Sequence, residues 1–124
     1  MKKLIIALCL GAVSSVSMAA TVCAGGVASA VASDAPAPAA RTKFVFTGFT
    51  PRCSANTQVD FQEDASSAAV GSTSFKGNQS FGGHSNGGAV VKYSDAPTGY
   101  TDAATALTAA VAAATAKLAE ASSS

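Results

Sequence analysis

The sequence has no tryptophan, few other aromatic residues and few charged ones. Of its 124 residues, 6% are aromatic and 12% are charged. Much of the 48% hydrophobic fraction is alanine, which buries little area per residue. The chain therefore has the material for one small domain with a thin core. Because it has no basic patch, we expect it to bind neither nucleic acid nor anionic lipid through its overall charge.

Catalytic motifs are also scarce. The only histidine is His84, and no serine lies in a Gly-x-Ser-x-Gly sequence, which disfavours a serine hydrolase. The glycine-rich run Gly77–Gly88 is not followed by Lys-Ser or Lys-Thr, as a phosphate-binding loop requires. No local ligand spacing suits zinc or calcium, and we expect Asp60, Glu63 and Asp64 to form a solvated rim. The sequence thus predicts a non-enzymatic protein without catalytic residues, cofactor or metal.

Long apolar runs are absent except near the N-terminus. Lys2 and Lys3 precede the apolar stretch Leu4–Val13. A more polar run then ends at Ala19, with small residues at the two positions that a signal peptidase recognises. A membrane anchor needs about twenty apolar residues, and Ser14 interrupts this stretch early. These features predict a secretory signal peptide of bacterial type.

The predicted signal peptide defines the expected domain organisation. Residues 1–19 are the signal peptide, and residues 20–124 form a single exported domain with no membrane span after cleavage. Within it, residues 20–98 are β-rich and include an Ala/Pro connector at 33–40, and residues 99–124 form a helix with a frayed end. The expected location is periplasmic or extracellular.

Cysteine is scarce too, with three in the chain. Cleavage after Ala19 removes Cys9 and leaves Cys23 and Cys53. An even pair in an exported chain predicts a disulfide, and on a chain-entropy model its loop closure stabilises the fold by about 3 to 4 kcal/mol. Two buried free thiols are the alternative.

The segment Lys43–Phe49 has the clearest strand pattern. Aromatic and β-branched residues alternate, so that Phe44 and Phe46 face one way and Val45 the other. Pro51 has no N–H to give to a ladder, so the strand should stop just before it. We expect Lys43–Phe49 to be a central strand.

Three other segments have weaker strand patterns. Ala20–Val31 is expected to be a strand broken by a bulge at Gly25-Gly26, with a short helix at its end as the alternative. Thr57–Gln62 alternates, and Ala68–Phe75 is a weaker strand. In Thr57–Gln62 the residues expected on one wet face are Gln58, Asp60 and Gln62.

The dipeptide Asn86-Gly87 is suited to a type I′ turn, in which both central residues need positive φ. A turn there pairs Gln79–Ser85 with Gly88–Ser94 and sets His84 across from Ala89, Gly82 across from Val91 and Ser80 across from Tyr93. The sequence therefore predicts a hairpin.

A C-terminal helix is predicted from Asp102, which can cap it, to about Ala121. Leu107, Val111 and Leu118 recur along one stripe that is expected to pack on the sheet. The predicted fold class is α+β: a small antiparallel β-rich domain with one disulfide and an alanine-rich C-terminal helix packed on the sheet.

These features favour a small exported structural or interaction protein of the bacterial periplasm or cell surface, such as a surface or fibre subunit. Its expected partners are a second copy of itself or another surface protein. The alternative is a periplasmic ligand-binding or inhibitor module that uses the Gly-rich Phe81–Ser85 loop. A long unpaired strand edge would favour assembly, and a deep apolar pocket would favour ligand binding.

Overall fold

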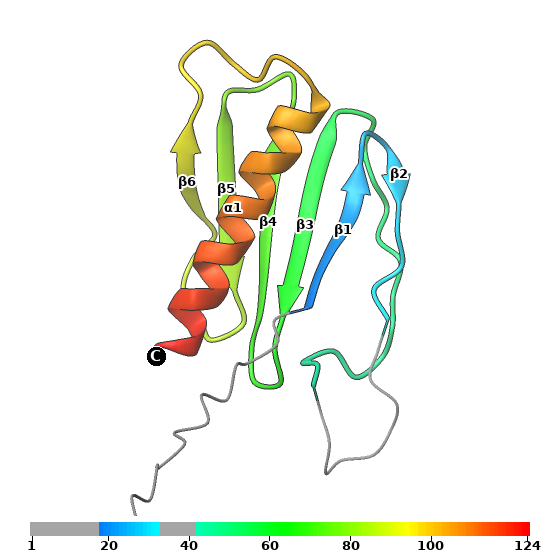
Figure 1. Cartoon of the computed structure of the whole chain (residues 1–124), viewed down its shortest axis with the longest axis vertical. Coiled ribbons are helices and arrows are strands. Elements are labelled where there is room, and N and C mark those ends of the chain that lie inside the picture. Colours follow the sequence, from blue (N-terminus) through cyan, green and yellow to red (C-terminus); the bar gives the residue numbers. More distant parts are fainter. Residues whose placement is uncertain (1–17, 33–41) are drawn as a thin grey trace, which may run out of the picture.

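The computed structural model describes residues 18–32 and 42–124, which form one antiparallel sheet and one helix (Figure 1). The strand order is β2-β1-β3-β4-β5-β6. The elements are β1 (Met18–Ala24), β2 (Val27–Ala28), β3 (Thr57–Glu63), β4 (Ala68–Ser74), β5 (Gln79–His84), β6 (Val91–Asp95) and α1 (Ala103–Ser122). The predicted α+β class is confirmed. The leader up to residue 17 and the predicted connector lie outside the described residues.

The first two strands form a tight hairpin. Gly25 and Gly26 turn the chain with φ of 58° and 91°, the pair of positive values that a type I′ turn requires. The predicted single strand with a bulge at these glycines is therefore wrong, because the chain reverses there. A bulge does occur earlier, where the pairing of β1 with β3 shifts between Thr21 and Cys23.

The segment 42–53 is a loop, so the predicted central strand at Lys43–Phe49 is wrong. Strand β3 is already paired with β1 on one side and with β4 on the other, so the sheet has no central position for a further strand. The loop makes one isolated bridge, between Phe49 and Val31. It otherwise lies across β1 and β3 and supplies side chains that cover them.

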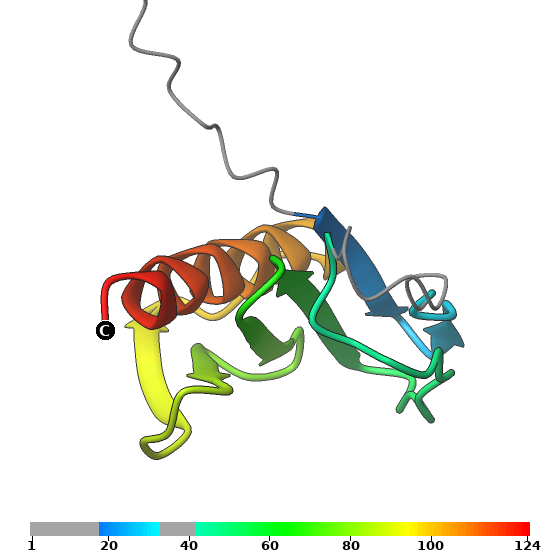
Figure 2. The same cartoon turned by 90° about the horizontal axis from the view of Figure 1, so that it is seen from below.

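Helix α1 is capped at its N-terminus by Asp102, whose Oδ1 accepts a hydrogen bond from Thr105 N at 2.7 Å. It lies on one face of the sheet, over β3, β4 and β5 (Figure 2). Its buried residues are Ala106, Ala110, Ala113, Ala114, Leu118 and Ala121. Of the predicted stripe, Leu118 is buried, whereas Leu107 and Val111 are half-buried. The helix face that packs on the sheet is therefore made mostly of alanine, and it is rotated relative to the predicted stripe.

Two glycines explain why alanine faces the sheet. A Cβ at Gly71 would collide with the carbonyl of Ala110 and lie 2.6 Å from Ala114 N. A Cβ at Gly82 would lie 2.8 Å from Lys117 Cγ. Because neither strand has a side chain at these points, α1 approaches the backbone of β4 and β5 so closely that only small helix residues fit.

The apolar core lies on the other face of the sheet, which we call the far face. Its buried cluster is Val22, Val31, Phe61 and Ala68. Phe49 packs edge-on against Phe61 with ring centroids 6.2 Å apart, and Val45 adds to the cluster. The predicted disulfide is present: Cys23 in β1 is bonded to Cys53 at the end of the loop, with Cα atoms 5.6 Å apart. The loop is thereby fixed over β1 and β3 on the far face.

Candidate functional site

The sheet face under α1 is polar. Its buried polar side chains are Gln58, Asp60, Gln62, Thr73 and Ser80. Gln58 and Asp60 are only 1% and 2% exposed. The predicted wet face of β3 is therefore wrong. Alternation groups these residues correctly, but α1 covers them instead of water.

Hydrogen bonds replace water for most of these groups. Thr73 Oγ1 donates to Ala106 O at 2.6 Å, and Gln62 Nε2 donates to Thr115 Oγ1 at 2.7 Å. Gln58 Nε2 is buried with no hydrogen-bond partner among the described residues. Hydrogen bonds of this kind fix where α1 sits, although each contributes only about 1 kcal/mol net.

Asp60 is the titratable group at the centre of this interface. Burial raises the pKa of its carboxyl, and hydrogen bonds from Gln62 Nε2 at 3.1 Å and Thr21 Oγ1 at 3.4 Å offset this only in part. Since α1 closes this face, the group belongs to the packing of the fold and does not open onto a binding surface.

The other two carboxylates of the expected rim also have partners inside the protein. Glu63 is 3% exposed, and its Oε2 accepts a hydrogen bond from Val45 N at 2.9 Å. Asp64 accepts from Ser66 N at 2.7 Å and from Ser122 Oγ at 3.0 Å. Burial raises the pKa of Asp64, but the hydrogen bonds outweigh it and hold the pKa below its usual range. The predicted solvated rim is therefore wrong for all three carboxylates.

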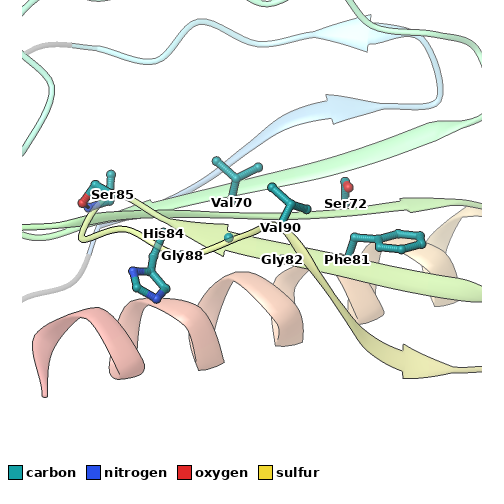
Figure 3. Close-up of a pocket in the computed structure, with 10 residues that line it drawn as sticks. Val70, Ser72, Phe81, Gly82, His84, Ser85, Gly88 and Val90 are labelled. Atoms are coloured by element: carbon teal, nitrogen blue, oxygen red, sulfur yellow. Dashed lines mark hydrogen bonds between the residues drawn. The ribbon is translucent and has the colours of Figure 1, made fainter. Parts of the chain in front are cut away.

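The far face is open where β4 and β5 run, beside the loop that covers β1 and β3. A hollow of about 420 Å³ lies there. The residues that give it its apolar character are Ala68, Val70, Phe81, Gly83 and Val90. Val70, Phe81 and Val90 are 41%, 38% and 72% exposed, and Figure 3 shows Val70 and Val90 rising from the same side of the sheet. The hollow is thus an uncovered apolar feature of the far face.

His84 lines the hollow only through its position in β5. Its imidazole points toward α1 (Figure 3), where Nε2 lies 4.0 Å from Glu120 Oε2. Ser72 lies on the far face, on the other side of the sheet from this imidazole (Figure 3). The hydroxyl of Ser85 accepts a hydrogen bond from Ala68 N at 3.0 Å. The hollow therefore offers apolar contact surface and no serine–histidine pair. The Phe81–Ser85 segment, expected as a loop, belongs mostly to β5.

The hairpin turn between β5 and β6 differs from the prediction. Gly87 and Gly88 have φ of 100° and 95°, and no described residue other than glycine has positive φ, so Asn86 is not part of a type I′ pair. Asn86 uses its side chain instead: Nδ2 donates to Ala121 O at 2.7 Å. The hairpin is thereby attached to the last turn of α1, a role that no local sequence signal indicated.

No protein-family model, curated protein or solved structure matches this chain. In the ranges 18–32 and 42–124, no helix has the length and apolarity needed to cross a membrane. The same ranges contain no group of three or more His, Cys, Asp or Glu residues placed to hold a metal ion. Function must therefore be inferred from the chain's own surfaces.

Proposed function

We propose that this chain is a small exported, non-enzymatic interaction protein of the bacterial periplasm or cell surface, and that its partner docks in the hollow of the far face. The observation that carries the proposal is the uncovered apolar surface of Val70, Phe81 and Val90. Folded monomers rarely expose large contiguous apolar patches without a use for them. A partner that covers these side chains removes their apolar surface from water, and this burial favours binding.

The exported location is part of the same proposal. The bond between Cys23 and Cys53 is compatible with an oxidising compartment. Strand β1 begins at Met18, so cleavage after Ala19 would remove two residues of the strand and leave its pairing with β3 from Ala20 onward.

Docking on the face has more support than assembly through strand edges. The edge strand β2 has two residues, and the other edge strand, β6, has five and a shifted register against β5. β6 also carries Lys92, paired with Asp95 at 2.8 Å. Short length, a bulge and an edge lysine are devices that discourage strand addition. A fibre built by strand addition is therefore the weaker form of the proposal.

A ligand-binding or inhibitor module is the second candidate, and the same hollow favours it. Its volume of about 420 Å³ lies within the range of about 300 to 1,000 Å³ found for small-molecule sites. Its lining is mostly apolar, so the ligand would be a small apolar molecule or the apolar side chains of a target protein.

Paired valine substitutions test the proposal. Val70→Asp places a charge in the hollow, whereas Val91→Asp is the matched control: Val91 is 40% exposed but lies across from Gly82 on the α1 side of the sheet. Binding of the amphiphilic, anionic dye anilinonaphthalene sulfonate, and the oligomeric state by light scattering, should change only in Val70→Asp. Equal dye binding and equal mass in both variants would contradict a docking role for the hollow.

A further inference from the structure

The far face of the sheet has a step in it. Over β1 and β3 the loop of residues 42–53, which we call the phenylalanine loop, adds a layer: Val45 packs on the core cluster, and Phe49 packs on Phe61. Strands β4 and β5 lie beneath the hollow of about 420 Å³ instead. The far face is therefore raised on one half and bare on the other.

The phenylalanine loop borders the hollow directly. Phe49 packs on Phe61, which pairs in the sheet with Val70 of the hollow. Val45 N donates a hydrogen bond at 2.9 Å to Glu63, the last residue of β3. These contacts place the loop along β3, the strand next to the floor of the hollow.

The outer side of the phenylalanine loop is aromatic. Phe44, Phe46 and Phe49 are 39%, 71% and 46% exposed. Phe49 exchanges two backbone hydrogen bonds with Val31 at 2.8 and 3.0 Å, and the disulfide at Cys53 fixes the loop's end. Because the loop is already held in place, it loses little conformational freedom when a partner covers its rings.

A stepped face is complementary to a second copy of itself. A two-fold axis that runs along the boundary between β3 and β4 turns the raised half of one copy toward the bare half of the other, and the same contact forms twice. We propose that the protein forms a two-fold symmetric dimer in which the phenylalanine loop of each copy, led by Phe46, occupies the hollow of the other. This inference rests on the proposed function, because it names the partner that docks in the hollow.

The exposed apolar area is sufficient for such a dimer. An aromatic side chain presents about 150 to 250 Å², so the exposed fractions of the four rings amount to about 400 Å² per copy, and the valines add on the order of 100 Å². Two copies together bury about 1,000 Å², the size at which a specific interface begins. We therefore expect a weak dimer that forms as concentration rises. The side chains counted are Phe44, Phe46, Phe49, Val70, Phe81 and Val90.

The charge of the chain does not oppose the contact. The formal net charge is +1, and it is −1 once Lys2 and Lys3 are removed. Two copies with so little net charge repel each other weakly. Apolar burial is then the main driving force, so the dimer should depend little on salt.

Sedimentation of the exported protein over a range of concentrations tests the proposal. We expect the mass to rise from one copy to two. Phe46→Ser should weaken the dimer about a hundredfold, because the dimer buries this ring twice and each burial contributes about tenfold. Val27→Ser is the matched control: Val27 is 68% exposed but pairs through Ala24 with Gln58, on the α1 side of the sheet, so this variant should dimerise like the wild type.

A mixture of two variants tests the geometry. Phe46→Ser loses the ring and keeps the hollow, whereas Val70→Asp keeps the ring and places a charge in the hollow. A mixed dimer has one intact contact between ring and hollow, and a dimer of either variant with itself has none. An equal mixture should therefore dimerise about tenfold more tightly than either variant alone.

Three results would overturn the proposal. They are the mass of a single copy at every concentration, a dimer that Phe46→Ser leaves unchanged, and a mixture that dimerises no more tightly than its components. Dye binding judges the proposed function separately. If the wild type binds the dye and Val70→Asp does not, the hollow remains a docking surface for a partner other than a second copy; if Val70→Asp also leaves dye binding unchanged, both proposals fail.

Discussion

Replacing Gly71 with alanine tests how closely α1 packs on the sheet. The added Cβ would collide with the carbonyl of Ala110 and lie 2.6 Å from Ala114 N, and backbone atoms cannot rotate away as a side chain can. Helix α1 must then lift off β4 or slide along it. Overpacking a well-packed site costs about 1 to 3 kcal/mol, and we expect Gly71→Ala to lower the free energy of unfolding by the upper part of that range, about 2 to 3 kcal/mol.

Gly83→Ala is the matched control on the far face. There the added Cβ would lie 3.1 Å from Val90 Cγ2, and Val90 is 72% exposed and can move. Alanine also loses less conformational entropy on folding than glycine does, so the expected change is below about 1 kcal/mol. Urea unfolding followed by circular dichroism gives both values. Equal free energies of unfolding for the two variants would refute the close contact between α1 and β4.

The remaining predictions concern the helix–sheet interface. Because burial raises the pKa of Asp60 above 3.8, the stability that this carboxyl contributes is fully present below pH 3.8 and is lost as pH rises through the folded-state pKa. Asp60→Asn should therefore gain stability relative to the wild type as pH rises through that window, and a pH-independent difference in denaturant unfolding would count against a desolvated carboxylate. Leu118→Ala should lower the free energy of unfolding by about 2 to 4 kcal/mol because Leu118 is 6% exposed. Leu107→Ala should lower it by less because Leu107 is half-buried. If thermal melts showed Leu107→Ala to be the less stable variant, the helix would not pack through the face described here.

Elements with strong local signals were predictable from the sequence. Thr57–Gln62 and Ala68–Phe75 became β3 and β4 with boundaries shifted by one residue, and Asp102 caps the helix as expected. The pairing of Gly82 with Val91 was also predicted correctly, whereas Ser80 pairs with Ser94 and not with Tyr93, because the register shifts between Ser80 and Phe81. Period-two alternation and side-chain capping act within a few residues, which is why they can be read without knowledge of the rest of the fold.

What the sequence could not reveal is which face of each element would be covered. Alternation grouped Gln58 with Asp60, but it carried no information that an alanine helix would lie on that side. The two closely packed glycines, Gly71 and Gly82, decide this, and their effect depends on strands and a helix distant in sequence. The segment Phe81–Ser85 was named as a possible binding segment and does line the hollow. The contribution of β4 was missed for the same reason as above: Val70 is recognisable as a member of a strand, but its exposure depends on the absence of a covering segment over β4 and β5.

The segment 42–53 shows how tertiary context overrides a local pattern. Its alternation is typical of a strand, yet the sheet has no place for it beside β3, and the disulfide at Cys53 holds it across β1 instead. The type I′ turn was likewise assigned to Asn86-Gly87, whereas Gly25-Gly26 has the required pair of positive φ values.

Amide NMR spectra of the exported protein, recorded during titration with anilinonaphthalene sulfonate, test the central claim that the far face is the docking surface. We expect the largest shifts in β4 and β5 at Val70, Ser72, Phe81 and Gly83, together with Val90 in the hairpin, and little change along the exposed side of α1. Shifts confined to α1, or shifts spread evenly over the sheet and the helix, would contradict it.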